Sequence, residues 1–157
     1  MTNIYRQTAL VSALALAMGL SSLAMADSDT FNVTATVQSV CSLTAGNDLA
    51  FGDYNPVTAD AVTGTTTIAV TCSNGMTGTA VGLAYNGQML NGTDSLSYGL
   101  FQDDGHATTW GTTELDRQAV TADGTAQTMI VYGQINAGQT ATPIGSYSET
   151  VTATVYF

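Results

Sequence analysis

The chain has 157 residues, of which 45% are hydrophobic and 9% charged, so it is long enough for one folded domain and too short for two comfortable ones. Twelve acidic residues stand against two basic ones, Arg6 and Arg117, and there is no lysine. Nucleic acids, anionic lipids and phosphate ligands are bound through clustered Lys and Arg, so this charge balance argues against all three as partners.

The first 26 residues have the pattern of a secretory signal peptide. Arg6 supplies a positive charge, residues 9–20 are mostly apolar, and Ala24-Met25-Ala26 is a small-x-small cleavage site. The alternative is a transmembrane anchor, but the apolar run is shorter than the roughly 20 residues that a span needs. We therefore expect export and a mature protein that starts at Asp27.

The remaining chain alternates between apolar and polar residues with a period of two, which predicts strands and turns rather than helices. The first alternating segment covers residues 30–37. Four residues share its apolar face: Phe31, Val33, Ala35 and Val37. A short strand starts at Cys41 and Leu43, and a short apolar pair follows at Leu49 and Phe51.

Further strands are predicted over residues 65–72, 79–85, 96–101, 127–132 and 147–157. Residues 102–125 have loop character, with Trp110 as the large apolar anchor. Asn-Gly pairs at 74–75, 86–87 and 91–92 are turn signals. In the last strand the apolar face comprises Tyr147, Val151, Ala153, Val155 and Phe157, and Glu149 is the acidic residue that interrupts it.

Many short strands at this spacing favour an all-β, immunoglobulin-like sandwich, with a closed barrel as the alternative. Two cysteines are present, Cys41 and Cys72. In an oxidising compartment such a pair is most simply a disulfide, whereas two free buried thiols would suit a reducing cytosol. In the chain-entropy model, a bond between Cys41 and Cys72 closes a loop of about 32 residues and stabilises the fold by roughly 3.7 kcal/mol.

The sequence offers little for catalysis. His106 follows Asp103-Asp104-Gly105 and could act as a base, but an exposed histidine in a turn is the commoner case. Glu114 and Asp116 would share one face of a strand, yet a solvated acidic face beside Arg117 is the simpler interpretation. We expect no enzyme, no cofactor and no metal, since the calcium-loop and zinc-ligand patterns are also absent.

Several motifs together resemble the spore coat protein U domain family, which includes pilin subunits of archaic chaperone-usher pili. They are the alternating segment before Cys41, the run Thr-Ile-Ala-Val-Thr-Cys-Ser-Asn-Gly through Gly75, and the strand 96–101 followed by Asp103, His106 and Trp110-Gly111. The most specific is the ending from Gly145 to Phe157, Gly-Ser-Tyr-Ser-Glu-Thr-Val-Thr-Ala-Thr-Val-Tyr-Phe. The resemblance covers essentially the whole mature chain.

The resemblance implies an incomplete sandwich that is completed by donor-strand complementation. Residues 27–39 would be the donor segment, with Phe31, Val33, Ala35 and Val37 as its inserted side chains, and residues 40–157 the pilin domain. The acceptor and chaperone edge would comprise Val151, Ala153, Val155 and Phe157. This edge is expected to lack a covering strand, and an uncovered alternating edge is an aggregation hazard.

The resemblance also implies partners and a location. A periplasmic chaperone would lend the missing strand, an outer-membrane usher would exchange it, and identical or related subunits would form a head-to-tail polymer for adhesion and biofilm growth at the cell surface. The alternative is a self-complemented secreted or spore-coat structural protein, in which residues 30–37 pair within their own sandwich as an ordinary first strand.

Overall fold

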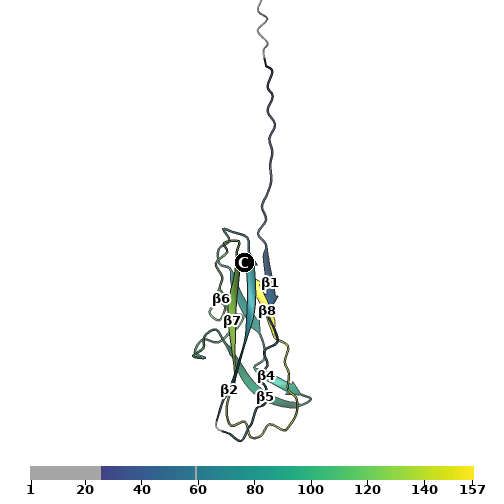
Figure 1. The fold of residues 1–157 in the computed structure, drawn as a ribbon, viewed down its shortest axis with the longest axis vertical. Helices are drawn as coiled ribbons and strands as arrows, with labels where there is room; N and C mark the ends of the chain where they lie inside the picture. Colours follow the sequence, from purple (N-terminus) through teal and green to yellow (C-terminus); the bar gives the residue numbers. More distant parts are fainter. Residues whose placement is uncertain (1–25, 59) are drawn as a thin grey trace, which may run out of the picture. The chain divides into compact units, whose positions relative to one another are not determined.

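The computed structural model describes residues 26–58 and 60–157 (Figure 1). The predicted signal peptide therefore lies outside the described residues, except for Ala26. The chain divides into two units, of which the first ends at Ala35 and the second runs from Thr36 to Phe157. Residues 26–35 form no strand, and their side chains are exposed. No helix that is long and apolar enough to cross a membrane occurs in the described ranges.

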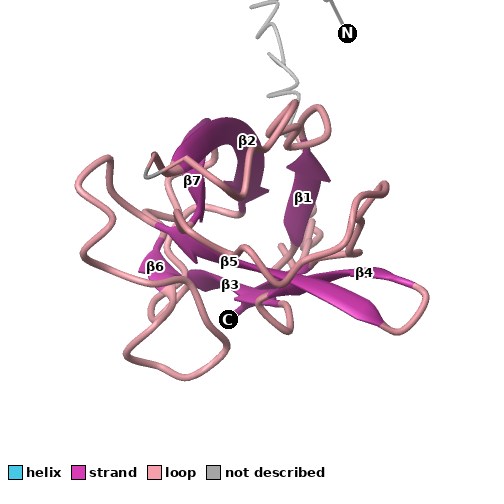
Figure 2. Ribbon diagram, turned by 90° about the horizontal axis from the view of Figure 1, so that it is seen from below, coloured by secondary structure: helices cyan, strands magenta, loops and turns pink. Residues whose placement is uncertain are grey.

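The second unit is built from antiparallel strands that form two sheets. The strands are β1 (Cys41–Ala45), β2 (Val62–Cys72), β3 (Ala80–Ala84), β4 (Gln88–Asn91), β5 (Asp94–Phe101), β6 (Gln118–Ala119), β7 (Ala126–Ile135) and β8 (Thr152–Tyr156). One sheet has the order β1-β2-β7-β5-β4 and the other the order β6-β3-β8. In Figure 2, β1, β2 and β7 lie on one side of the core and β3 and β6 on the other. The prediction of an all-β, immunoglobulin-like sandwich is confirmed.

The core follows from the period of two in the longest strands. In β2 the residues Ile68, Val70 and Cys72 are buried, as the alternation predicts, and each exposes 3% or less of its surface. The neighbouring strand β7 contributes Met129 and Val131, so the two strands present one apolar face. Side chains on one face of a strand repeat every second residue, which is why the intervening Ala69 and Thr71 remain outside this core.

Several predicted elements differ from the structure. The two-residue β6 lies within the predicted loop 102–125, and β5 and β7 extend beyond the residues predicted for them. Strand β4 was not predicted, because its four residues lie between two Asn-Gly turns. Strand β2 begins at Val62, before the predicted start. The last strand covers Thr152–Tyr156 rather than residues 147–157, since Ser148 instead exchanges two backbone hydrogen bonds with Leu90 of β4, of 2.9 and 3.2 Å. The chain thus crosses from one sheet to the other between Ser148 and Thr152.

A pair of glycines explains how Leu49 and Phe51, which form no strand, pack on the core. Gly64 and Gly133 are cross-strand partners in β2 and β7. A Cβ atom at Gly133 would lie 2.8 Å from the ring of Phe51 and 2.9 Å from Leu49 Cδ1. The glycines therefore leave room on the sheet, and the ring of Phe51 reaches Tyr98 at a centroid distance of 6.0 Å.

Candidate functional site

Strands β1 and β8 each have one edge that pairs with no other strand of the described chain. β1 is hydrogen-bonded to β2, and β8 is hydrogen-bonded to β3, so the two belong to different sheets. They nevertheless lie side by side (Figure 1). An unpaired edge presents a row of backbone donors and acceptors that another strand can bind.

A groove of about 480 Å³ opens beside these two strands. One wall is formed by the end of β1 and the segment that contains Leu49 and Phe51, and the other by residues 147–151 and Ala153. Four of its lining residues are core residues that expose 3% or less of their surface: Ile68, Leu83, Leu100 and Val131. The groove therefore gives access to the apolar interior between the sheets.

The predicted acceptor residues are distributed unequally along this edge. Val151 and Ala153 line the groove. Val155 is half-buried against the core, opposite Val81 of β3. Phe157 exposes 64% of its surface and is not among the lining residues. The apolar alternation of the last strand thus supplies both a groove wall and a core contact.

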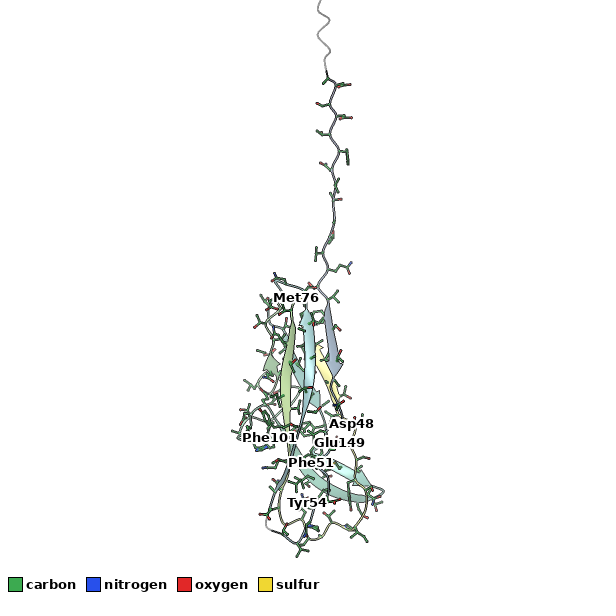
Figure 3. All side chains as sticks on the ribbon, in the orientation of Figure 1. Asp48, Phe51, Tyr54, Met76, Phe101 and Glu149 are labelled. Atoms are coloured by element: carbon green, nitrogen blue, oxygen red, sulfur yellow. A yellow bond between two sulfur atoms is a disulfide. The ribbon has the colours of Figure 1, made fainter. Side chains whose placement is uncertain are left out.

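Glu149 places a carboxylate in the wall of this groove. Its Oε1 accepts a hydrogen bond from the backbone N–H of Asn86, whereas Oε2 is buried with no hydrogen-bond partner. Burial, reinforced by the neighbouring Glu149 carboxylate, raises the pKa of Tyr98. Asp48 also lines the groove, and Figure 3 shows Asp48 and Glu149 at the same level of the sandwich as Phe51. This part of the groove is acidic as well as apolar.

The predicted donor residues are exposed. Phe31, Val33 and Val37 expose 87%, 84% and 91% of their surfaces, and Ala35 is also exposed. All four lie outside the strands of the structure. Large apolar side chains at alternate positions are unusual on a solvated segment, because strands with this pattern normally bury one face.

The two cysteines form the predicted disulfide. Cys41 and Cys72 are bonded to each other, and they are also cross-strand partners at one end of the β1–β2 ladder. The bond therefore fastens β1, the groove-forming edge strand, to the interior of its sheet.

The residues considered for catalysis make contacts that stabilise a turn of the fold. His106 has a positive φ of 54° and is half-buried rather than exposed, with its ring edge-on to Phe101 at 5.0 Å. Asp103 accepts hydrogen bonds from the backbone of Ala107 and Thr108, which lower the pKa of its carboxyl. These contacts define a turn. Within the described ranges, no group of three or more His, Cys, Asp or Glu could hold a metal ion.

Glu114 and Asp116 lie in the loop before β6. The Asp116 carboxylate accepts a hydrogen bond of 2.6 Å from the Thr113 hydroxyl. Arg117 instead stacks on the ring of Tyr156 in β8, 3.4 Å from its centroid, and donates to the carbonyl of Thr112. The single arginine of the described residues is thus part of the outer packing of the smaller sheet.

Sequence patterns did not reveal three of the groove residues as such. Met89 belongs to the unpredicted β4. Tyr98 lies in the strand predicted over 96–101 and Leu49 in the predicted apolar pair, but none of the three was predicted to line a groove. Gly64 and Gly133 were the sequence signal that could have located Leu49, because a glycine inside a strand marks a close approach of another segment.

Comparison with known proteins gives one family. A family model described as Spore Coat Protein U domain matches residues 27–154. No curated protein matches the chain.

Proposed function

The chain belongs to the spore coat protein U domain family, a family of structural proteins of the pilin type, and we propose that it is a fibre subunit assembled by donor-strand exchange along the chaperone-usher route. In this proposal, residues 27–39 of one copy insert into the groove of the next. The assembled fibre serves attachment and biofilm growth at the cell surface.

The observation that carries this proposal is the presence of two complementary features in one chain. The groove exposes core residues between two unpaired strand edges, β1 and β8. The segment 31–37 carries four exposed apolar side chains at alternate positions. A strand added to a sheet edge gains backbone hydrogen bonds, and its alternate side chains fill pockets beneath it.

Burial of the donor side chains supplies the driving force. Phe31, Val33 and Val37 each gain about 1.5–3 kcal/mol when they are fully buried. This gain opposes the loss of translational and conformational freedom on association. Because each copy offers one donor and one groove, the contact is heterologous and propagates into an open filament.

The route of assembly follows from the same exposed surfaces. A subunit with an open groove would aggregate before assembly, so a periplasmic chaperone that occupies β8 and its groove is required, with an outer-membrane usher to exchange it. We propose that residues 1–26 direct export and are removed. The intact mass of the periplasmic protein tests this: a chain that starts at Asp27 supports it, and a retained leader contradicts it.

Photo-crosslinking tests the exchange itself. Phe31 is replaced by benzoylphenylalanine in the mature chain, and equal amounts of ¹⁴N- and ¹⁵N-labelled protein are mixed, refolded and irradiated. We expect crosslinks from position 31 to groove residues such as Phe51 or Ala153, half of them between light and heavy copies. The matched control places the same group at Thr30, on the opposite face of the segment.

The alternative of a self-complemented protein predicts another result. Its crosslinks would all lie within single chains, so no crosslink between a light and a heavy copy would form. Deletion of residues 27–37 separates the two further, because a self-complemented sandwich would lose a core strand and fail to fold. A fibre subunit that lacks these residues still accumulates with its chaperone but cannot enter the polymer behind another subunit.

A further inference from the structure

Ser73 holds the residues that lead into β1. Its backbone N–H donates a hydrogen bond of 2.9 Å to the carbonyl of Val40. Its Oγ accepts a bond of 3.1 Å from the Val40 N–H, and the hydroxyl lies 3.1 Å from the carbonyl of Gln38 and 3.2 Å from that of Val40. These contacts continue the β1–β2 ladder beyond the Cys41–Cys72 pair.

This position matters because the donor segment immediately precedes β1 in the chain. To fill its own groove, the segment would have to fold back as a hairpin along the free edge of β1. Directly opposed residues of an antiparallel pair share one face. In β1 the half-buried residues are Cys41 and Leu43, so the four donor residues must lie opposite odd-numbered positions.

Register then decides which loop would work. A three-residue loop at 38–40 places Val37 opposite Cys41 and Ala35 opposite Leu43, which turns the apolar face inward. A two-residue loop at 38–39 shifts the pairing by one and turns Thr34 and Thr36 inward instead. The hairpin that keeps all four donor side chains inward-facing therefore needs a turn made of the three residues 38–40, whose two ends Ser73 holds in the extended ladder.

A turn placed before the ladder would leave only part of the donor segment able to fill the groove. If residues 38–40 remain extended and the loop is formed by residues 35–37, then Phe31 lies opposite Cys41 and Asp29 lies opposite Leu43. Two of the four donor side chains are lost to the loop, and a carboxylate faces the core. Burial of an unpaired carboxylate is strongly unfavourable.

The residue types in this segment also disfavour a turn. Residues 33–41 contain no Gly, Pro, Asn or Asp. A three-residue hairpin loop ends on a residue with positive φ, a position that Gly suits and that a β-branched residue such as Val40 disfavours. The β4–β5 hairpin of this protein places Gly92 at its turn, with a φ of 63°.

We propose that Ser73 is a positioning residue that prevents self-complementation and so commits the donor segment to a second copy of this chain. Val40 contributes to the same effect, because its β-branched side chain disfavours the positive φ that the turn requires. This inference rests on the proposed donor-strand exchange. Ser73 does not line the groove. Its hydroxyl acts by holding residues 38–40 in an extended conformation.

The isotope-mixed crosslinking measures this commitment as the ratio of intramolecular to intermolecular crosslinks from position 31. Removal of the hydroxyl bonds in Ser73→Ala raises the ratio about tenfold, since each net hydrogen bond contributes on the order of 1 kcal/mol. Ser73→Thr keeps the hydroxyl and restores the wild-type ratio. Ser42→Ala, at an exposed serine of β1, is the matched control and leaves the ratio unchanged.

A second pair of variants tests the turn independently of Ser73. Val40 exposes 56% of its surface, so its side chain is dispensable for the core. Val40→Gly supplies a residue suited to positive φ and raises the intramolecular share, and this share does not change on dilution. Val40→Ala removes the same side chain without that freedom and leaves the ratio near wild type. If Ser73→Ala fails to fold, an unchanged intramolecular share in Val40→Gly still overturns the inference, because the turn at 38–40 would then not be what prevents self-complementation.

The outcomes separate this inference from the proposed function. A wild-type protein that crosslinks between copies, with unchanged ratios in Ser73→Ala and Val40→Gly, overturns the inference and leaves the exchange intact. A ratio that rises equally in Ser73→Thr and Ser73→Ala also overturns it, because the hydroxyl would then be irrelevant. A wild-type protein that crosslinks only within one copy overturns both.

Discussion

One pentapeptide, Val-Thr-Ala-Thr-Val, occurs twice in this chain, at residues 33–37 and 151–155, and the two copies have different environments. In the first, Val33 and Val37 expose 84% and 91% of their surfaces, and no strand is formed. In the second, four of the five residues belong to β8, and Val155 is half-buried against the core. Identical β-propensity thus gives a strand in one place and a solvated segment in the other.

The two copies differ in whether a neighbouring strand pairs with them. Ala153 and Val155 lie opposite Leu83 and Val81 of β3, both of which are buried. Strand propensity reflects packing on a half-buried pleated surface more than an intrinsic backbone preference. The first copy has the side chains for such a surface, and the proposed exchange would supply the surface from another subunit.

The largest expected contrast comes from equivalent substitutions at the last residue of each pentapeptide. Val155→Asp buries an unpaired carboxylate opposite Val81 and should lower the free energy of unfolding by about 4 kcal/mol, with loss of recovery alongside the proposed chaperone. Val37→Asp should change it by less than about 0.5 kcal/mol while abolishing polymer formation. Denaturant unfolding and polymer yield are measured for both. Equal destabilisation would mean that Val37 belongs to its own core.

Removal of the disulfide is expected to have the next largest effect. The double substitution Cys41→Ser and Cys72→Ser should lower the free energy of unfolding by about 3 kcal/mol, because the unfolded chain regains the entropy of an open loop. Urea unfolding of the oxidised protein and of the double variant measures this. An unchanged midpoint would show that β1 is held by its ladder alone.

Alkaline pH probes the groove wall beside the second pentapeptide. Burial and the Glu149 carboxylate raise the pKa of Tyr98, so the phenol ionises more readily in the unfolded chain than in the folded one. Its contribution is fully present below pH 10 and is lost as the pH rises above it, by at most about 1.4 kcal/mol per pH unit. Tyr98→Phe should remove this part of the decline between pH 10 and 11. An unaltered decline would assign it to other groups.

The smallest expected contrast involves the central alanines. Ala153→Gly weakens a paired strand and should cost about 0.5–1 kcal/mol. Ala35→Gly should leave the unfolding of the single subunit unchanged, because residue 35 is exposed and unpaired there. The thermal midpoints of the two variants provide the comparison, and a lower midpoint for Ala35→Gly would contradict it.

Periodicity predicted the strands whose alternation is complete. Ile68, Val70 and Cys72 are buried as expected, because a strand covered on one face has the simplest sequence signature. Prediction was wrong at residues 147–151, where the chain changes sheets. The alternation continues through that crossing, since Tyr147 packs against the core and Val151 lines the groove, and nothing in the pattern marks the loss of a hydrogen-bonded neighbour.

The groove could be predicted only in part for a related reason. Its edge residues Val151 and Ala153 follow from the alternation, but its other wall depends on Leu49 and Phe51 lying over Gly64 and Gly133. That contact joins positions that are far apart in the sequence. A period of two describes a single strand, and it carries no information on which segment covers a glycine.

The position of the disulfide has a mechanical consequence. A pulling force on the N-terminal segment enters the sandwich at Cys41, the first residue of β1, and Cys41 is bonded to Cys72 at the end of β2. The load therefore passes covalently into the long central β2–β7 ladder and bypasses the hydrogen bonds of β1. Under tension on the N-terminal segment, β1 would therefore stay attached to β2 even if the hydrogen bonds between the two strands broke.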